Sequence, residues 1–522
     1  MIEVASLSLD IAGLPILRDV SFAIGEGEVF GLVGESGSGK SLTSLSLLRL
    51  LPQGAAVSGA ARLDGRDLLA LTEAEMCAFR GDDIALIGQE PMTALNPVMT
   101  IGDQVAETLR VHGRASRAEA AGLAAERLAR VGLPPDRCPP SRYPHELSGG
   151  QRQRVAIAAA IALRPRLLIA DEPTTALDVT TQAQILALLK GLVVEERMSL
   201  LLITHDLAVV AGMADRIAVM QGGRIVEQGP TEAVFRTLGH PYTRQLFAAS
   251  GHVPARQVQP GGAPLLEVRG AVRDYRLSRR SLFDKAPSFR AVNGVGFTLR
   301  RGESLGLVGE SGSGKSTLAR AILGLEPLQG GEIQLGGAPV RAGDPRMQVV
   351  FQDPYGSFNP RHRVARLVAE PFHSTGRPAD AAARVAEALE AVHLKASDAD
   401  KYIHEFSGGQ RQRIAIARAL ITRPELIVLD EAVSALDVSV RARILDLLAE
   451  LQAGFGLSYL FITHDLHVVR AITDRVLVMK SGEIVEEGPT GEVLAAPRHP
   501  YTRQLIAAAP AIPAGWTAHR TG

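Results

Sequence analysis

The stretch Gly-Glu-Ser-Gly-Ser-Gly-Lys-Ser occupies residues 34–41 and recurs, letter for letter, at residues 309–316. Both copies fit the pattern G-x-x-x-x-G-K-[ST] of phosphate-binding loops. The glycines allow a tight turn, so the main-chain N–H groups point at a polyphosphate. The lysine reaches the β- and γ-phosphates, and the serine hydroxyl is a ligand for Mg²⁺. The sequence therefore predicts two phosphate-binding loops in one chain.

We expect every residue of these two phosphate loops to contact bound nucleotide. An apolar strand-like run, Val29–Val33, precedes the first loop, and a helical pattern opens at Lys40. This context places the loop at a helix N-terminus, which binds anions. The predicted nucleotide-binding residues are Gly34, Glu35, Ser36, Gly37, Ser38, Gly39, Lys40 and Ser41 in the first copy, and Gly309, Glu310, Ser311, Gly312, Ser313, Gly314, Lys315 and Ser316 in the second.

The motifs after the loops also occur twice, in the same order. Ser-Gly-Gly-Gln, Asp-Glu and Thr-His-Asp each recur 259 positions further along the chain. A repeat this long indicates duplication of a whole domain, since solenoid repeats span only about 20–50 residues. We predict a first nucleotide-binding domain at residues 1–247, a Pro/Gly-rich linker at 248–263 and a second domain at 264–522.

Each half has the pattern of an α/β domain. Strand-like sequence at 2–24 and 265–299 precedes the phosphate loops, and helical spacing follows at 101–130 and 364–392. Short continuous apolar runs at 167–170 and 200–203, with counterparts at 426–429 and 459–462, are typical of parallel strands buried on both faces. The predicted fold is two tandem P-loop NTPase domains, each with an α/β core, an N-terminal antiparallel β part and a helical subdomain.

Composition excludes several classes of protein. Lys+Arg and Asp+Glu both number 56, so the formal charge is zero, which disfavours nucleic-acid binding. No apolar run reaches the roughly 18 residues that span a bilayer, so we expect a soluble chain that meets membranes only through partners. The two cysteines, Cys77 and Cys138, form no cluster, and we predict neither a structural metal nor an iron–sulfur centre.

An acidic pair follows a buried-strand pattern in each half, as Asp171-Glu172 and Asp430-Glu431. An Asp at the end of such a strand can hold Mg²⁺, and the next Glu can polarise an attacking water. Downstream of a phosphate loop, this arrangement predicts nucleotide hydrolysis.

Ser-Gly-Gly-Gln-Arg-Gln-Arg, at residues 148–154 and 407–413, resembles the signature motif of ABC ATPases. A serine hydroxyl and glycine N–H groups at a helix start provide a second anion site. The resemblance implies that each signature completes the ATP site of the opposite domain, so that Lys40 faces Ser407 and Lys315 faces Ser148. The signature residues are Ser148, Gly149, Gly150, Gln151, Ser407, Gly408, Gly409 and Gln410.

The same resemblance assigns further roles, with ATP and Mg²⁺ as the ligands. It implies glutamines that sense Mg²⁺, switch histidines that touch the γ-phosphate and D-loop aspartates that cross the interface. The implied catalytic residues are Glu172, Glu431, His205, His464, Gln89 and Gln352; the metal-site residues are Ser41, Gln89, Asp171, Ser316, Gln352 and Asp430; the D-loop residues are Asp178 and Asp437.

The two predicted adenine pockets differ. Tyr275 aligns with the aromatic residue that stacks on adenine, whereas Ile11 stands at the matching position of the first half. Because both halves keep the lysine, the acidic pair, the histidine and the signature serine, we predict two hydrolysis-competent sites, with weaker nucleotide affinity at the one built on Lys40.

Several longer motifs resemble the oligopeptide/dipeptide/nickel importers among the ABC transporters. They are Gln-Glu-Pro-Met-Thr-Ala-Leu-Asn-Pro at 89–97, Phe-Gln-Asp-Pro-Tyr-Gly-Ser-Phe-Asn-Pro at 351–360 and His-Pro-Tyr-Thr-Arg-Gln-Leu at 240–246 and 499–505. A fused pair of domains is similar to the ATPases of microcin C/peptide and glutathione importers. The resemblance implies a peripheral protein on the cytoplasmic face of the cell membrane, with two permease subunits and, indirectly, a solute-binding protein as partners. Segments 91–97 and 354–360 are then the expected docking sites for permease helices.

An alternative is a twin ATPase without a transport role, such as a ribosome-associated translation factor. That class joins its domains by a long charged helix, while the linker here is short and rich in Pro and Gly, and the neutral charge disfavours ribosomal RNA. We therefore favour import of di- or oligopeptides. Nickel, glutathione and peptide-like antibiotics stay open as cargo, because specificity belongs to the partners.

Overall fold

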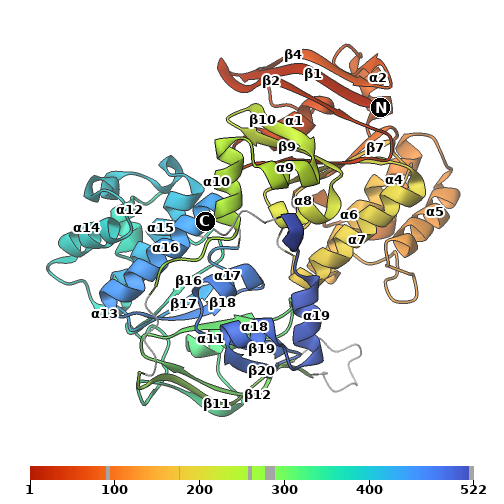
Figure 1. Cartoon of the computed structure of the whole chain (residues 1–522). Coiled ribbons are helices and arrows are strands. Elements are labelled where there is room, and N and C mark those ends of the chain that lie inside the picture. Colours follow the sequence, from red (N-terminus) through yellow and green to blue (C-terminus); the bar gives the residue numbers. More distant parts are fainter. Residues whose placement is uncertain are drawn as a thin grey trace.

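A computed structural model describes residues 1–89, 94–175, 177–256, 262–276, 288–353, 356–434 and 436–516. Figure 1 shows two halves of similar construction, the N-terminal half above the C-terminal half. Each half contains one four-stranded antiparallel sheet and one six-stranded sheet. The strands follow the same order in both halves, as expected for a duplicated domain, whereas the helix Glu73–Phe79 has no counterpart among the described residues of the second half.

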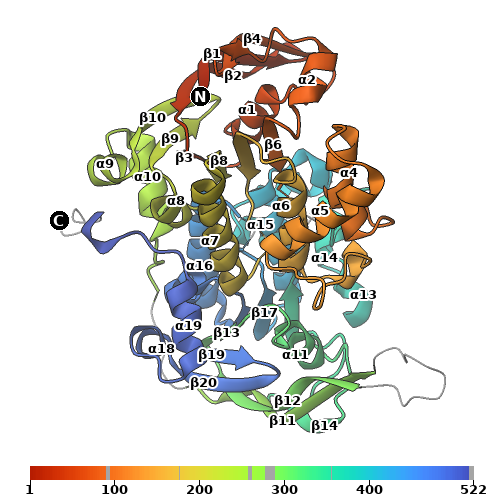
Figure 2. The same cartoon turned by 90° about the vertical axis from the view of Figure 1, so that its right-hand side faces the viewer.

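The antiparallel sheets lie at the two outer ends of the molecule (Figures 1 and 2). In the first half the strand order is β2-β1-β4-β5, and in the second it is β12-β11-β14-β15. The strands are β1 (Ile2–Ile11), β2 (Leu14–Ile24), β4 (Ala55–Leu63), β5 (Arg66–Asp67), β11 (Pro264–Arg276), β12 (Ser288–Arg300), β14 (Gly330–Leu335) and β15 (Ala338–Pro339). The predicted N-terminal strands of both halves are thus present.

The six-stranded sheets form the cores that carry the phosphate loops. Their orders are β10-β9-β3-β8-β7-β6 and β16-β17-β18-β13-β19-β20. Within each, only the pair at one edge, β9–β10 or β19–β20, is antiparallel. The strands are β3 (Val29–Val33), β6 (Ile84–Ile87), β7 (Leu167–Asp171), β8 (Ser199–Thr204), β9 (Arg216–Gln221), β10 (Arg224–Pro230), β13 (Ser304–Val308), β16 (Met347–Val350), β17 (Leu426–Asp430), β18 (Ser458–Ile462), β19 (Arg475–Lys480) and β20 (Glu483–Pro489).

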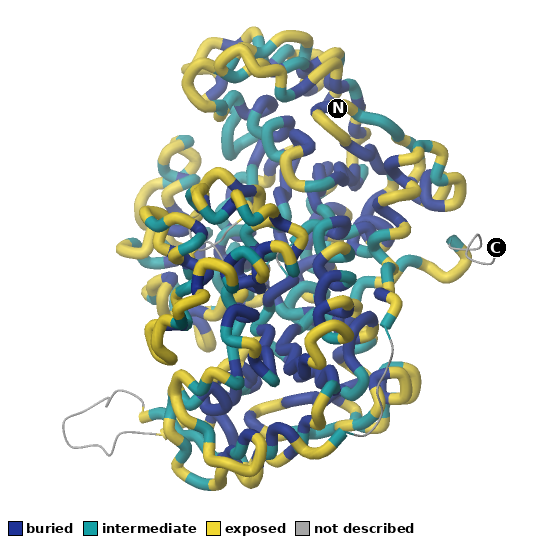
Figure 3. The backbone as a smooth tube through the Cα atoms, turned by 90° about the vertical axis from the view of Figure 1, so that its left-hand side faces the viewer, coloured by how far each residue is buried: buried dark blue, intermediate teal, exposed yellow. Residues whose placement is uncertain are grey.

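Every residue of β3, β8, β13 and β18 is buried, which explains their continuous apolar sequence. The carboxyl ends of parallel strands meet at one edge of a sheet, so the loops after β3, β7 and β8 converge there, and this edge is the usual ligand site of such sheets. Figure 3 shows that buried residues fill the interior while exposed ones cover the periphery.

Helices cover the six-stranded sheets and build a helical part beside each. The predicted helical stretch at 101–130 is two helices, α4 and α5, separated at residues 112–116, and the stretch at 364–392 is three, α12, α13 and α14. The helices of the first half are α1 (Lys40–Leu47), α2 (Glu73–Phe79), α4 (Ile101–Val111), α5 (Arg117–Arg130), α6 (Gly149–Ala160), α7 (Val179–Glu196), α8 (Leu207–Met213), α9 (Thr231–Thr237) and α10 (Pro241–Ser250). Those of the second are α11 (Lys315–Ile322), α12 (Val364–Val368), α13 (Phe372–Thr375), α14 (Ala381–Ala391), α15 (Gly408–Leu420), α16 (Val438–Phe455), α17 (Leu466–Ile472), α18 (Thr490–Ala495) and α19 (Pro500–Ala508). Within the described ranges, no helix combines the length and apolarity needed to cross a bilayer.

The two halves pack on one another in a reciprocal way. Helix α10 of the first half packs on α16 of the second, and α19 of the second packs on α7 of the first (Figures 1 and 2). After α10 the chain is held to the second half, where His252 Nε2 lies 2.6 Å from Asp446 Oδ1 and Arg256 pairs with Asp474 at 2.9 Å. In return, the ring of Trp516 packs against that of Phe235, with centroids 5.7 Å apart.

Candidate functional site

Each phosphate loop connects a buried strand to a helix, as its sequence predicts. Lys40 opens α1 directly after Gly39, and Lys315 opens α11 directly after Gly314. Both glycines are left-handed, with φ of 103° and 108°. A Cβ on Gly314 would lie 2.2 Å from the carbonyl oxygen of Ala291, so only glycine fits this turn.

The lysine of each loop lies folded inside the loop. Lys40 Nζ donates hydrogen bonds to the carbonyl oxygens of Gly34 and Glu35 at 2.8 and 2.9 Å. Lys315 Nζ makes the equivalent bonds to Gly309 and Glu310 at 2.7 and 2.8 Å. Burial lowers the pKa of both ammonium groups. A polyphosphate would supply the negative charge that these buried cations need.

The acidic residue at the end of β7, which β8 separates from β3 in the sheet, interacts with the loop serine. Asp171 ends β7, and an interaction with the Ser41 side chain partly offsets the effect of burial on the pKa of its carboxyl group. Asp171 Oδ1 is buried and has no hydrogen-bond partner among the described residues. Burial also raises the pKa of Asp171 and of Asp430, its counterpart at the end of β17. Mg²⁺ prefers oxygen ligands such as hydroxyl and carboxylate groups. The Ser41 hydroxyl and the Asp171 oxygen that is unpaired among the described residues therefore fit this ion.

Glu172, directly after β7, contacts two of the predicted site residues, His205 and Gln89, and also Thr175, which the sequence analysis did not name. Glu172 Oε1 lies 3.1 Å from His205 Nδ1, and Glu172 Oε2 accepts hydrogen bonds from Gln89 Nε2 at 3.1 Å and from the Thr175 hydroxyl at 2.9 Å. In the second half Glu431 Oε1 lies 3.2 Å from His464 Nδ1. Gln352 lies on the wall of the central cavity described below. Both glutamates have left-handed backbone, with φ of 47° and 51°, a strain typical of functional sites.

The electrostatics keep Glu172 ionised. Burial alone would raise the pKa of this carboxyl, but the hydrogen bond and charge of His205, together with the Thr175 hydroxyl, lower it to about 2. Conversely, burial disfavours charged His205, yet its bonds to Glu172 raise the histidine pKa overall. The pKa of Glu431 is lowered in the same way, against burial, by His464. An ionised glutamate beside the loop can accept a proton from an attacking water.

The two D-loops, Leu177–Asp178 and Leu436–Asp437, differ in what their aspartates contact. Asp437 Oδ1 accepts a hydrogen bond of 2.8 Å from the main-chain N–H of Ser36, in the first phosphate loop. Asp178 instead caps its own helix, because its carboxylate accepts from the N–H and the hydroxyl of Thr181, both at 3.0 Å. Its charge still acts on Lys315 of the other half.

The signature segments form the starts of two helices. Ser148 precedes α6 and forms a reciprocal cap with Gln151. Ser407 precedes α15, and both its N–H and its hydroxyl donate to Gln410 Oε1, at 3.0 and 3.2 Å. A Cβ on Gly150 would lie 2.4 Å from the Thr181 methyl carbon, and one on Gly409 would lie 2.6 Å from Val440 Cγ1. Glycine at these positions therefore lets each signature helix pack against the helix that follows the D-loop of its own half.

The predicted adenine contact, Tyr275, is the penultimate residue of β11 and lies beside helix α11. Its hydroxyl hydrogen-bonds to Glu326 and lies 3.5 Å from the Thr317 hydroxyl, while the Arg273 guanidinium covers its ring at 4.9 Å. Phe289, directly opposite Tyr275 in the sheet, is 51% exposed and offers a second aromatic ring that the sequence analysis missed. At the first site, Ile11 pairs with Leu14, so both positions are aliphatic.

Two further tyrosines contact the phosphate loops, and the sequence analysis did not identify them as site residues. The main-chain N–H of Glu35 donates to the Tyr242 hydroxyl at 3.2 Å, and that of Glu310 donates to the Tyr501 hydroxyl at 2.9 Å. Burial raises the pKa of each phenol to about 12, so both stay neutral. The available signal was the doubled His-Pro-Tyr-Thr-Arg-Gln-Leu motif, which supplies these tyrosines from α10 and α19.

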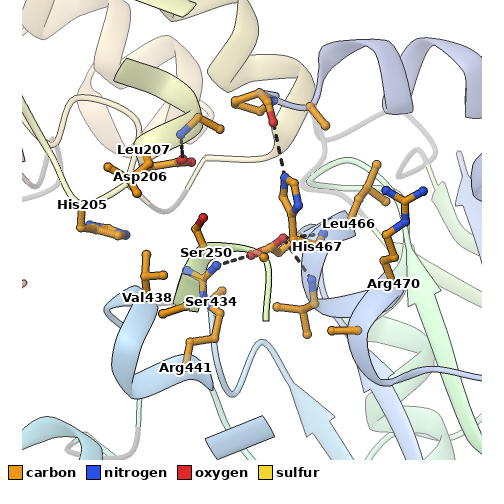
Figure 4. A pocket seen from close by; sticks show the side chains of 18 of the residues that line it. His205, Asp206, Leu207, Ser250, Ser434, Val438, Arg441, Leu466, His467 and Arg470 are labelled. Atoms are coloured by element: carbon orange, nitrogen blue, oxygen red, sulfur yellow. Dashed lines mark hydrogen bonds and ion pairs between the residues drawn. The ribbon is translucent and has the colours of Figure 1, made fainter. Parts of the chain in front are cut away.

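A central cavity of about 520 Å³ lies between the halves, and Figure 4 shows its lining. The switch loops, Thr204–Asp206 and Thr463–Asp465, approach it from opposite halves together with the first turn of α16. Arg441 on α16 points into this space and pairs with Asp465 at 2.8 Å (Figure 4). The histidines of the two sites thus border one shared space.

Comparison with known proteins agrees with this geometry. The family model described as ABC transporter matches residues 17–175 and 292–434, and the model described as the C-terminal region of oligopeptide/dipeptide transporters matches 226–265 and 485–522. The chain is 48% identical over 540 residues to the glutathione import ATP-binding protein GsiA of Escherichia coli K12, covering 95% of this chain and 86% of that protein. The GsiA of Salmonella choleraesuis is 48% identical over 538 residues, with the same coverage. The resemblance predicted from the motifs is confirmed: the chain belongs to the ABC transporter family, as an ATP-binding ATPase subunit of a peptide-type importer that carries two ABC domains in one polypeptide.

Proposed function

We propose that this chain powers the uptake of glutathione or closely related short peptides. The observation that carries the proposal is the 48% identity to GsiA, named as a glutathione import ATP-binding protein, across 95% of this chain. Both C-terminal regions of the oligopeptide/dipeptide type support a peptide-like cargo. The chain itself contributes the motor, and its partners select the solute.

The motor consists of two composite ATP sites. We assign residues 1–247 and 264–522 to the two nucleotide-binding domains and 248–263 to the linker. The Lys40 site combines that lysine with Ser407 and Asp437 of the second domain, and the Lys315 site combines its lysine with Ser148 and Asp178 of the first. The hydrogen bond between Ser36 and Asp437 supports this pairing.

Each site contains the groups that hydrolysis requires. At the Lys40 site, Ser41, Asp171 and Gln89 would hold Mg²⁺, which neutralises charge on the phosphates. Glu172 accepts the proton of the attacking water, and His205 holds Glu172 in place through its 3.1 Å contact. At the Lys315 site the corresponding metal-site residues are Ser316, Asp430 and Gln352, with Glu431 as base beside His464.

Hydrolysis drives transport by opening and closing the two domains. ATP bound between them contacts both, so it favours the closed state by the difference in its affinity for the two states. After cleavage the γ-phosphate no longer bridges the domains, and they separate. Two permease subunits receive this motion, and a solute-binding protein delivers cargo to them from outside. The motor therefore lies at the cytoplasmic face of the membrane, attached through the permeases and without a nucleic-acid partner.

A groove of about 670 Å³ in the second half is the proposed seat of one permease helix. It is lined by the exposed apolar residues Leu325 and Phe351, the latter next to Gln352. Arg418 also lines this groove, where it donates to the Ser357 carbonyl oxygen at 3.1 Å and pairs with Glu370 at 3.1 Å. Residues 354 and 355 of the predicted docking segment lie outside the described residues, as do residues 91–93 of its counterpart.

The first half offers a related but different surface. Leu50 occupies the place of Leu325 after the phosphate-loop helix and is likewise exposed. Gly88 precedes Gln89 where Phe351 precedes Gln352, and Ala159 stands in place of Arg418. This difference supports two non-identical permease partners.

Uptake measured in cells tests the proposed cargo. A strain lacking this gene is complemented with the wild-type gene or with Lys315→Ala, and accumulation of labelled glutathione and of a dipeptide panel is measured. We expect the wild type to restore glutathione uptake and the variant to fail. Restored uptake of dipeptides without glutathione would replace glutathione by general peptides as the cargo. No change for any peptide would overturn the proposal.

A further inference from the structure

The two helices that follow the D-loops begin alike and then diverge. Helix α7 opens after Asp178 with Val-Thr-Thr-Gln, and α16 opens after Asp437 with Val-Ser-Val-Arg. The divergent third and fourth residues are Thr181 and Gln182 in the first half, and Val440 and Arg441 in the second. These sequence differences between the halves give the two D-loops different surroundings.

The difference at the third position decides where each aspartate points. The Thr181 hydroxyl and N–H hold the Asp178 carboxylate on its own helix. Val440 has no hydroxyl, and Asp437 makes no side-chain cap on α16. Its carboxylate is therefore available to the Ser36 N–H of the opposite phosphate loop.

The difference at the fourth position adds a charged link. Arg441 Nη2 donates to the carbonyl oxygen of Leu436 at 3.2 Å, within the D-loop itself. Arg441 Nη1 donates to Asp465 Oδ2 at 2.8 Å, in the switch loop that carries His464. The other oxygen of Asp465 accepts from the N–H groups of α17 at 2.8 and 3.3 Å. One guanidinium thus joins the D-loop that serves the Lys40 site to the switch loop of the Lys315 site.

The surroundings make this link energetically significant. Burial disfavours ionised Asp465, and the Arg441 charge helps to keep its pKa low. The same charge acts on His205, the switch histidine of the opposite half, across the cavity in Figure 4. A partly buried, hydrogen-bonded ion pair resists rearrangement more than an exposed one does.

We propose that Arg441 is a positioning residue that couples the two ATP sites, by tying the D-loop of the Lys40 site to the switch loop of the Lys315 site. The first half cannot form the mirror link, because Gln182 carries no charge to pair with Asp206. Coupling therefore runs through one side of the interface only. The proposal rests on the proposed assignment of catalytic residues to the two sites.

A double-mutant cycle tests the link in the full chain. ATP hydrolysis is measured for Arg441→Gln, Asp465→Asn and the double variant, with kcat, KM and the Hill coefficient for ATP. We expect each single change to lower kcat by about tenfold, with KM within about twofold because neither residue touches ATP. The Hill coefficient falls toward one. The double variant is no worse than either single variant, since one link is lost only once.

The first half supplies the matched control cycle. Gln182→Ala, Asp206→Asn and their combination are measured in the same way, and their effects are expected to add. Arg441→Lys keeps the positive charge, so its Hill coefficient for ATP should stay above that of Arg441→Gln. If Arg441→Gln folds poorly, Arg441→Lys still tests the link. Additive losses for Arg441 and Asp465, or an unchanged Hill coefficient in Arg441→Gln, would overturn the proposal. The parent ATPase activity and its loss in Glu172→Gln and Glu431→Gln test the site assignment separately, without reference to Arg441.

Discussion

The main-chain N–H of Ser36 donates a hydrogen bond of 2.8 Å to the carboxylate of Asp437, a residue 401 positions later in the chain. One partner belongs to the first phosphate loop and the other to the D-loop of the second half. The bond therefore joins two sequence motifs that lie in opposite halves of the chain. It also makes the geometry of the Lys40 site dependent on how the halves pack.

The two D-loop aspartates should respond differently to replacement by alanine. Asp437→Ala removes a contact to the opposite loop, so we expect a lower kcat with little change in the free energy of unfolding. Asp178→Ala removes a helix cap and should destabilise the chain by about 1 kcal/mol. Chemical denaturation and ATPase assays of both variants check this. Equal losses of stability would contradict the different roles seen for the two carboxylates.

The glutamates beside the histidines should be essential for hydrolysis. Loss of a general base costs about 10²–10⁴-fold in rate, so Glu172→Gln and Glu431→Gln should each abolish most of the hydrolysis at its own site. Both variants should still bind ATP, because the phosphate loops are intact. Nucleotide binding by equilibrium dialysis and steady-state ATPase rates check both statements. Unchanged hydrolysis in either variant would remove that glutamate from the mechanism.

The tyrosines of α10 and α19 should tune ATP affinity. Removing a hydroxyl that accepts from a main-chain N–H costs about 1 kcal/mol, which corresponds to roughly a fivefold change in an equilibrium constant. We expect Tyr242→Phe and Tyr501→Phe to raise KM for ATP by that factor, while the exposed Tyr143→Phe serves as control. A KM that matches the control in both variants would show that these hydroxyls do not shape the loops.

The pair of His205 and Glu172 should make stability depend on pH. The folded pKa of His205 is raised, so the stabilisation is fully present below the unfolded value of about 6.5 and is lost as pH rises through the folded pKa. The pKa of Glu172 is lowered to about 2, so acid removes the pair only as pH falls toward that value. We expect the difference in melting temperature between wild type and His205→Gln to be larger at pH 6 than at pH 9. A difference that grows with pH would contradict the pairing.

Much of this architecture is accessible from the sequence because it is encoded locally. Continuous apolar strands, the two glycine-rich loops and the acidic residues at strand ends all follow from short stretches of chain. The meeting of Gln89, Glu172 and His205 follows from parallel topology, which brings the carboxyl ends of strands together.

What the sequence could not supply depends on packing between distant segments. The resemblance implied D-loop aspartates that cross the interface, but the partner of Asp437, the Ser36 N–H, depends on the relative placement of the two halves. The contact of Tyr242 with the phosphate loop could not be predicted, because it requires α10 to pack against that loop. Arg441 read as an ordinary helix residue, since its partners come from two other loops.

Disulfide trapping tests most directly whether the ATP sites are shared between the halves. In a chain with Cys77→Ser and Cys138→Ala, Ser36→Cys is combined with Asp437→Cys or, as control, with Asp178→Cys, and mild oxidation is followed by gel mobility. A disulfide requires Cα atoms within about 7 Å. Shared sites predict rapid cross-linking of the pair at 36 and 437, with ATPase activity falling on oxidation and returning on reduction to that of the unoxidised variant, and no cross-link for the pair at 36 and 178. Cross-linking of 36 to 178, without any between 36 and 437, would contradict a site built from both halves.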